Sequence, residues 1–209
     1  MTPSQVFLLS PARCDGRRAA MLLKPEATSP AADRLRAGTL TLGDAFTFMS
    51  ALYFRGKLTY AQAFSNADPS GPTSYIITPT RGLQTPDSLV SVSLLQEFAA
   101  TDIASGDTAY RAPLDRDLAL LANRLSDTTR VILLGSIASN KYVDALAPVL
   151  GERLHYPASF IGRGDMSRGG LLLRSAAAGL ELDYVRLDTT ATRRGVRPPR
   201  LEPAPRRQR

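Results

Sequence analysis

The sequence predicts an α/β fold, in which a central, mostly parallel sheet of four to five strands has helices on both faces. Short apolar segments alternate with helical patterns along the chain, and strands that are joined through helices run parallel. These segments are apolar throughout instead of at every second residue, which is typical of strands buried on both faces. A length of 209 residues, with 44% hydrophobic and 22% charged residues, suits one such domain.

Four segments are predicted strands, at residues 6–10, 74–78, 130–135 and 154–161, and residues 182–187 are expected to add a fifth at an edge. The turn residues of 66–73 predict a loop. Two alternatives stay open within 84–108, where 89–95 suit a strand and 93–100 suit a helix.

Helices are predicted between these strands, and four of them begin at a residue suited to cap a helix: Asp15, Ser29, Asp44 and Ser139. Pro30 favours a first helical turn directly after Ser29, and Gly179 is expected to end the last helix. The apolar spacing predicts helices over 17–23, from 30, over 45–64 (the longest), 114–125, 139–150 and 167–178.

The positive charge is concentrated at the C-terminal end. The formal net charge is +7, and seven arginines with one acid, Glu202, place most of it in residues 192–209. Four prolines and few apolar residues stand in the same stretch, so we predict a single α/β domain over 1–190 and a disordered basic tail over 191–209. Such a tail attracts the phosphates of DNA or RNA, although a solvated, dispensable extension has the same composition.

Several classes of protein are excluded by composition. Cys14 is the only cysteine and His155 the only histidine, so we expect no internal disulfide and no metal site. The chain contains no phosphate-binding Gly-Lys-Ser/Thr motif and no dinucleotide fingerprint after the first predicted strand, and we expect no cofactor. No apolar run approaches the roughly 20 residues of a membrane span, and no secretory signal is recognisable at the start, so a cytoplasmic protein is expected; the oligomeric state stays open.

Polar and glycine-rich loops follow all four predicted strands. Ligands bind outside the carboxyl ends of the strands in open parallel sheets, so we expect these loops to converge on one ligand site. The chemistry of an anion or nucleobase site is supplied by hydroxyl, amide, aromatic and basic side chains and by backbone N–H groups. The predicted substrate- or phosphate-binding residues are Ser10, Arg13, Arg81, Gly82, Asn140, Lys141, Tyr142, Gly162, Arg163, Gly164, Ser167 and Arg168.

The loop after the fourth strand has the most specific composition. Its glycines permit close backbone approach, and Arg163 and Arg168 can each hold a phosphate or a base edge. Asp165 is a candidate base, although Asp165 and Ser167 would also suit a tight turn in which they only cap the next helix.

Cys14 and Asp15 are the other candidate catalytic residues. Cys14 stands before a predicted helix and among arginines, which would lower the thiol pKa of a nucleophile, with Asp15 or Asp165 to move the proton. A small, semi-buried cysteine without chemistry is the alternative.

Five segments of the chain resemble the YaaA-like family, whose members are peroxide-stress and DNA-associated proteins related in fold to uracil-DNA glycosylases. These segments, within residues 6–175, are LLSPARCDG, ALYFRGKLTYAQAF, IITPTRGLQTPD, VILLGSIASNKYVDAL and GRGDMSRGG. The resemblance implies a uracil-DNA-glycosylase-like α/β fold, a pocket for a ligand or base at the strand ends and a nucleic-acid partner. The water-activating Gly-Gln-Asp-Pro-Tyr and the late His-Pro-Ser of the glycosylases are absent, so the standard route of uracil excision is not implied.

Three functions are compatible with these features. The first is an enzyme that modifies or hydrolyses a nucleobase of DNA or RNA, flipped into the site, for instance a 7-deazaguanine derivative as in similar domains. The second is a non-enzymatic DNA-binding stress-response protein that uses the basic tail. The third is an enzyme acting on a free nucleotide or nucleoside.

Overall fold

One mixed sheet of six strands forms the centre of the molecule. The computed structural model describes residues 4–65, 71–103, 107–138, 140–187, 195–199 and 201. The strands lie in the order β3-β2-β1-β4-β5-β6. Their bounds are Gln5–Leu9 (β1), Ser74–Ile77 (β2), Leu83–Gln84 (β3), Arg130–Leu134 (β4), Leu154–Pro157 (β5) and Tyr184–Arg186 (β6).

The four central strands run parallel, and each overlaps a predicted apolar segment. The fourth is shorter than the predicted 154–161, because β5 ends at Pro157 and Ala158–Phe160 form a 3-10 helix. β1 pairs with β2 on one side and with β4 on the other, and β4 pairs with β5. The short outer strands β3 and β6 are antiparallel to their neighbours. The α/β prediction is therefore confirmed. β6 supplies the expected edge strand, whereas the second edge strand, β3, was not predicted.

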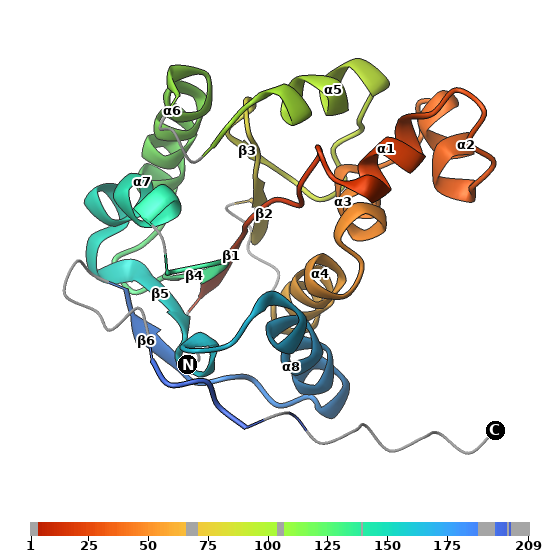
Figure 1. Ribbon diagram of the computed structural model, residues 1–209. Coiled ribbons are helices and arrows are strands. Elements are labelled where there is room, and N and C mark those ends of the chain that lie inside the picture. The colour runs from red at the N-terminus through yellow and green to blue at the C-terminus, as the bar shows by residue number, and fades with distance from the viewer. Residues whose placement is uncertain are drawn as a thin grey trace.

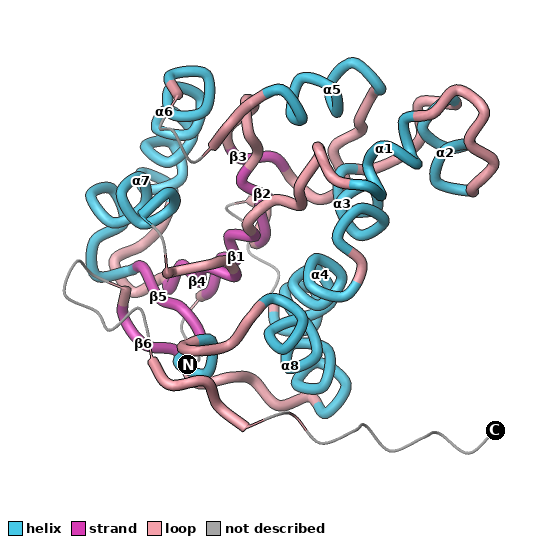
Figure 2. Tube along the Cα trace, in the orientation of Figure 1, coloured by secondary structure: helices cyan, strands magenta, loops and turns pink. Residues whose placement is uncertain are grey.

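Helices cover both faces of the sheet. The α-helices in the described part of the chain are Arg17–Leu23 (α1), Pro30–Arg36 (α2), Leu42–Ser50 (α3), Leu52–Phe64 (α4), Val92–Ala100 (α5), Thr108–Arg124 (α6), Asn140–Leu150 (α7) and Asp165–Ala178 (α8). Figures 1 and 2 show α6 and α7 on one side of the strands, with α3, α4 and α8 on the other.

Alternate residues of the central strands enter two separate cores, which explains why these strands are apolar throughout. Phe7 and Leu9 of β1 pack with α1–α5 and α8, whereas Val6 and Leu8 pack with α6 and α7. All four side chains are fully buried. Each strand of this kind therefore needs an unbroken apolar sequence.

The predicted longest helix is two helices. Ala51 separates α3 from α4 in a backbone conformation with φ of 47°, which a non-glycine residue rarely adopts and which no local sequence signal predicts. The cap of α3 is Thr41, whose hydroxyl accepts a hydrogen bond from the backbone N–H of Asp44. Asp44, the predicted cap, lies in the first turn and forms an ion pair with Arg34.

The other helix predictions were mostly close. Ser29 caps α2 as expected, and Gly179 ends α8 with φ of 65°. Asp15 does not cap α1, which begins after Gly16 without a side-chain cap, and the predicted cap of α7, Ser139, lies outside the described residues.

Two regions needed the structure to decide their fold. The segment after β3, for which a strand over 89–95 and a helix over 93–100 were alternative predictions, forms helix α5, and Ser91 caps this helix. Helix α6 begins at Thr108, ahead of the predicted 114.

Part of the predicted tail packs on the domain. The described residues 195–199 and 201 lie against the β5–α8 loop and the first turns of α8, where Val196 contacts Gly162 and Leu201 contacts Gly170.

Candidate functional site

The order of the parallel strands locates a crevice at the edge of the sheet. From β1 the chain passes to β2 on one side, and the later strands β4 and β5 are added on the other. The loops that leave β1 and β4 consequently diverge and leave space between them. In open α/β sheets this switch point is where ligands bind.

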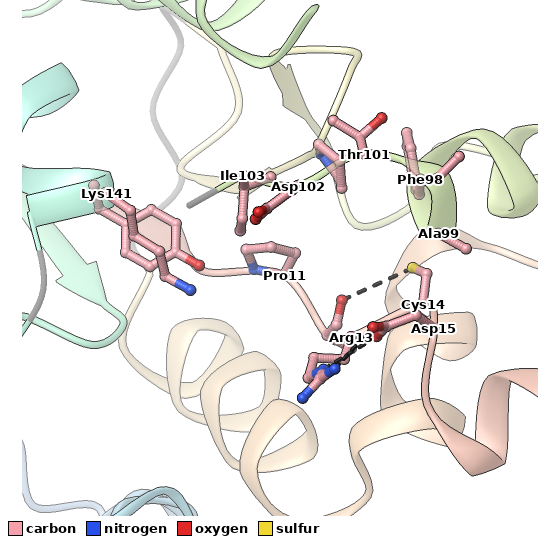
Figure 3. A pocket seen from close by; sticks show the side chains of 14 residues that line it. Pro11, Arg13, Cys14, Asp15, Phe98, Ala99, Thr101, Asp102, Ile103 and Lys141 are labelled. Atoms are coloured by element: carbon pink, nitrogen blue, oxygen red, sulfur yellow. Dashed lines mark hydrogen bonds and ion pairs between the residues drawn. The ribbon is translucent and has the colours of Figure 1, made fainter. Parts of the chain in front are cut away.

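A cavity of about 390 Å³ lies at this switch point (Figure 3). Its walls are residues 11–15 after β1, Pro79 after β2, residues 98–103 at the end of α5, and Lys141 and Tyr142 at the start of α7. We call it the switch-point pocket. Its volume is within the range of small-molecule sites.

Basic and acidic groups share the walls of the switch-point pocket. Lys141 is half-buried, and this burial lowers its pKa, while the nearby carboxylates of Asp165 and Asp102 act in the opposite direction. In Figure 3, Lys141 lies to the left of Pro11, Asp102 lies above it and Arg13 lies below it. The pocket thus offers both cationic groups for an anion and a carboxylate that can accept hydrogen bonds.

Asp15, a predicted catalytic residue, lies in the wall of the pocket but is paired with Arg13. The guanidinium donates two hydrogen bonds to the carboxylate, at 2.8 and 3.1 Å. The hydrogen bond from Arg13 holds the pKa of Asp15 below its usual value. Asp15 is therefore ionised near neutral pH and is a weak proton acceptor.

Cys14 also borders the pocket, but its thiol is not activated. The residue is 6% exposed, and Sγ donates to the carbonyl oxygen of Ala12 at 3.8 Å. Burial raises the thiol pKa to about 12, and the charge of Asp15 adds to the rise. The expectation of a lowered thiol pKa was wrong, because burial of the sulfur raises it.

The predicted site residues after β2 do not reach the pocket. Arg81 forms an ion pair with Glu97 of α5 at 2.6 Å and lines a separate depression with it. Gly82 has φ of 62° and leaves room for the carboxylate of Asp117, which accepts a hydrogen bond from the Leu83 N–H. These residues hold the β2–β3 turn to the neighbouring helices.

The loop after β4 brings two of its three predicted site residues to the pocket. Lys141 and Tyr142 line the pocket, and Asn140 is exposed one residue earlier, at the start of α7. Tyr142 is buried, and its pKa is raised chiefly by that burial, while the nearby Ser10 side chain partly opposes the rise.

The arginines of the loop after β5 bind the protein's own backbone and side chains. Arg163 donates to the carbonyl of Ser159 and to the hydroxyl of Ser167. Arg168 is buried and donates twice to the carbonyl of Phe160, at 3.2 and 3.3 Å. Neither lines the switch-point pocket, because both guanidiniums complete the turn from β5 into α8.

The glycines of this loop also have structural roles. Gly162 has φ of 71°, and a Cβ there would lie 2.2 Å from the carbonyl oxygen of Val196. Helices α4 and α8 cross at Gly56 and Gly169, where a Cβ on Gly56 would lie 2.6 Å from the Gly169 oxygen. Gly164, which precedes α8, has open space around it. Close helix packing therefore explains part of the glycine content that suggested a ligand loop.

Asp165, the remaining predicted catalytic residue, is exposed at the start of α8. Its carboxylate lies 3.5 Å from a guanidinium nitrogen of Arg168. Its charge raises the pKa values of Lys57 and Lys141, although burial lowers both. Among the predicted residues of this loop, Asp165 is thus the one with a described electrostatic link to the pocket.

Lys57 of α4 is the residue that the sequence analysis missed. It is 1% exposed, and Nζ donates to the carbonyl oxygen of Ser10 at 2.5 Å and to its Oγ at 2.8 Å. The ring centroids of Tyr53 and Phe54 lie 4.5 and 4.9 Å from Nζ. The available signal was a lysine three or four residues from Tyr53, Phe54 and Tyr60, on the apolar face of the helix.

No family model, curated protein or solved structure matches the chain. Within the described ranges, no group of three or more histidine, cysteine, aspartate or glutamate side chains is placed to hold a metal ion. In the same ranges, no helix has the length and apolar character needed to cross a membrane.

Proposed function

We propose that the protein is a nucleic-acid-associated enzyme that acts on a nucleobase of DNA or RNA, bound in the switch-point pocket. The observation that supports this most is the position of that pocket between the loops of β1 and β4, with Arg13 and Lys141 in its walls. The cavity of about 390 Å³ is large enough for a base with part of its sugar-phosphate.

The chemistry of the walls suits such a ligand. Lys141 and Arg13 would bind a phosphate or another anionic group. Asp102 would accept hydrogen bonds from the N–H groups of a base, and the apolar surfaces of Phe98 and Ile103 would contact its ring. The parallel centre of the sheet and the resemblance to the YaaA-like family also favour the proposal, including its uracil-DNA-glycosylase-like fold and a 7-deazaguanine derivative as the base.

Calorimetric titration tests the proposal. Guanine, 7-deazaguanine, nucleoside monophosphates and short oligonucleotides would be titrated into the wild type, Lys141→Gln and Arg13→Gln. We expect each variant to bind at least about tenfold more weakly, since a charge-assisted hydrogen bond contributes about 1.5–3 kcal/mol. Lys24→Gln, at an exposed lysine on the outer end of α1, is the matched control. Equal affinity of Lys141→Gln and Lys24→Gln, or no binding by the wild type, would contradict the proposal.

The basic tail makes DNA binding without catalysis the second candidate. The slope of a plot of the logarithm of the DNA-binding constant against the logarithm of the salt concentration measures the number of phosphates bound. Changing the seven arginines of the tail to glutamine would reduce this slope by up to about six if each arginine contacts a phosphate of duplex DNA. If Lys141→Gln still binds oligonucleotides and the tail variant does not, the result would favour a DNA-binding protein without catalysis. Binding of monophosphates but not oligonucleotides would favour the third function, an enzyme on free nucleotides.

A further inference from the structure

A serine and a lysine meet behind the wall of the switch-point pocket. Ser10 directly follows β1, and the next residue, Pro11, lines the pocket. The Ser10 Oγ lies 2.8 Å from Nζ of Lys57. Tyr142, which also lines the pocket, lies near the Ser10 side chain, which lowers its pKa. The pair is buried and lies directly behind the part of the pocket wall that Pro11 and Tyr142 form.

The neighbouring strand leaves space for the serine. Gly135 follows β4 directly beside Ser10, and a Cβ at Gly135 would lie 3.0 Å from the Ser10 Cβ. The hydroxyl also lies within 3.4 Å of the Leu134 carbonyl oxygen. The Ser10 side chain is therefore held between β4 and α4.

The environment of Lys57 favours the neutral amine. A buried ammonium costs several kcal/mol unless an opposite charge compensates it. No ion pair of Lys57 is found in the described part of the chain, and its compensation consists of the two Ser10 oxygens and two ring faces. Burial has the largest effect and lowers the pKa of Lys57 to about 7; among the charged groups, Asp165 raises this pKa, and Lys141 and Arg168 lower it.

We propose that Ser10 and Lys57 form a nucleophile and general base that serve the switch-point pocket. The substrate class is an amide or ester carbonyl on the ligand, and only the identity of that ligand depends on the proposed function. A neutral lysine amine in hydrogen-bond contact with a serine hydroxyl is a known arrangement for activating serine.

The reaction follows from this contact. The Ser10 Oγ bonds to the carbonyl carbon while its proton moves to the neutral Nζ of Lys57. The tetrahedral adduct then expels its amine or alcohol, which takes that proton from Nζ and leaves an ester on Ser10. Water, deprotonated by Nζ in the same way, attacks the ester, and the proton returns to Oγ as the acid leaves.

Labelling with a small fluorophosphonate tests the pair without any nucleobase. The Ser10 Oγ would bond to phosphorus, fluoride would leave, and the hydroxyl proton would pass to Lys57. Intact-mass and peptide mass spectrometry should find one adduct, on Ser10. The labelling rate should rise with pH, with a midpoint near 7, since the neutral amine predominates above the pKa of Lys57.

Variants separate catalysis from a structural role. Ser10→Ala should abolish labelling, and Lys57→Met should slow it at least about 100-fold. Arginine at position 57 keeps a cation and hydrogen-bond donors, but it stays protonated and cannot take the proton from Ser10. Lys57→Arg should therefore preserve any structural role of Lys57 and lose labelling at every pH. Ser93→Ala, at an exposed serine of α5, is the control and should label as the wild type does.

Each contrary outcome is distinct. Absence of an adduct on Ser10 in folded wild type, an adduct on another residue only, or wild-type labelling of folded Lys57→Arg would overturn the proposal. Circular dichroism establishes that each variant is folded. Because the probe carries no nucleobase, such a failure leaves the calorimetric test of the proposed function unaffected.

Discussion

The buried lysine makes the stability of the protein depend on pH in a way that Lys57→Met should remove. The pKa of Lys57 is lowered from 10.5 to about 7 by burial in the folded protein. Between these two values the unfolded chain binds a proton that the folded protein does not, so the free energy of unfolding rises with pH. Below about pH 7 the buried, charged lysine lowers the free energy of unfolding by the full amount, and above about pH 10.5 this destabilisation is absent.

The size of the effect follows from the shift. The whole difference corresponds to about 5 kcal/mol, at about 1.4 kcal/mol for each pKa unit. Between about pH 7 and pH 9.5 the wild type should therefore gain about 3 kcal/mol relative to Lys57→Met. Methionine leaves the two Ser10 oxygens without their lysine donor, which costs about 1–3 kcal/mol for each buried group without a partner but does not change with pH in this range.

Urea unfolding followed by circular dichroism at several pH values measures this difference directly. Tyrosine ionisation at high pH occurs in both proteins and cancels in the comparison. Lys24→Met, at an exposed lysine, serves as the control and should show no pH-dependent difference from the wild type. If the difference in free energy of unfolding between wild type and Lys57→Met is the same at about pH 7 and about pH 9.5, within about 0.5 kcal/mol, the reasoning is refuted.

Two further predictions concern Gly169, which belongs to the glycine-rich segment GRGDMSRGG, and Cys14, a candidate nucleophile. Gly169→Ala should destabilise the protein by about 1–3 kcal/mol in urea unfolding, because its Cβ would lie 2.7 Å from the Leu52 oxygen. Gly170→Ala, whose Cβ meets only Leu201 at 3.6 Å, is the control and should be neutral or stabilising by up to about 1 kcal/mol; equal effects at both positions would contradict the helix-crossing argument. Cys14 should react with a disulfide reagent at pH 8 at least about 100-fold more slowly in the folded protein than in urea, since its pKa is about 12; similar rates would show that the thiol is accessible and ionised.

Apolar periodicity was sufficient for the fold class. Residues 6–10 and 130–135 are apolar without interruption, and this pattern predicted β1 and β4 because both faces of those strands are buried in helices. The helix cap at Ser29 was also predictable from the sequence, because a cap is a contact between residues only three positions apart in the chain.

The break at Ala51 and the edge strand β3 were not predictable in this way. Both depend on contacts between segments distant in sequence: α4 turns away from α3 to cross α8, and β3 pairs with β2 through a turn held by Asp117 of α6. Local propensity carries no information about such contacts.

The candidate site divides in the same manner. The strand pattern of the sequence placed Arg13, Lys141 and Tyr142 in loops at the carboxyl ends of parallel strands, and in the structure these three residues line the switch-point pocket. Only the tertiary structure decided that Arg163 and Arg168 bind backbone carbonyls. The direction in which a long side chain points depends on which buried acceptors lie within reach, and those acceptors are placed by the packing of the whole chain.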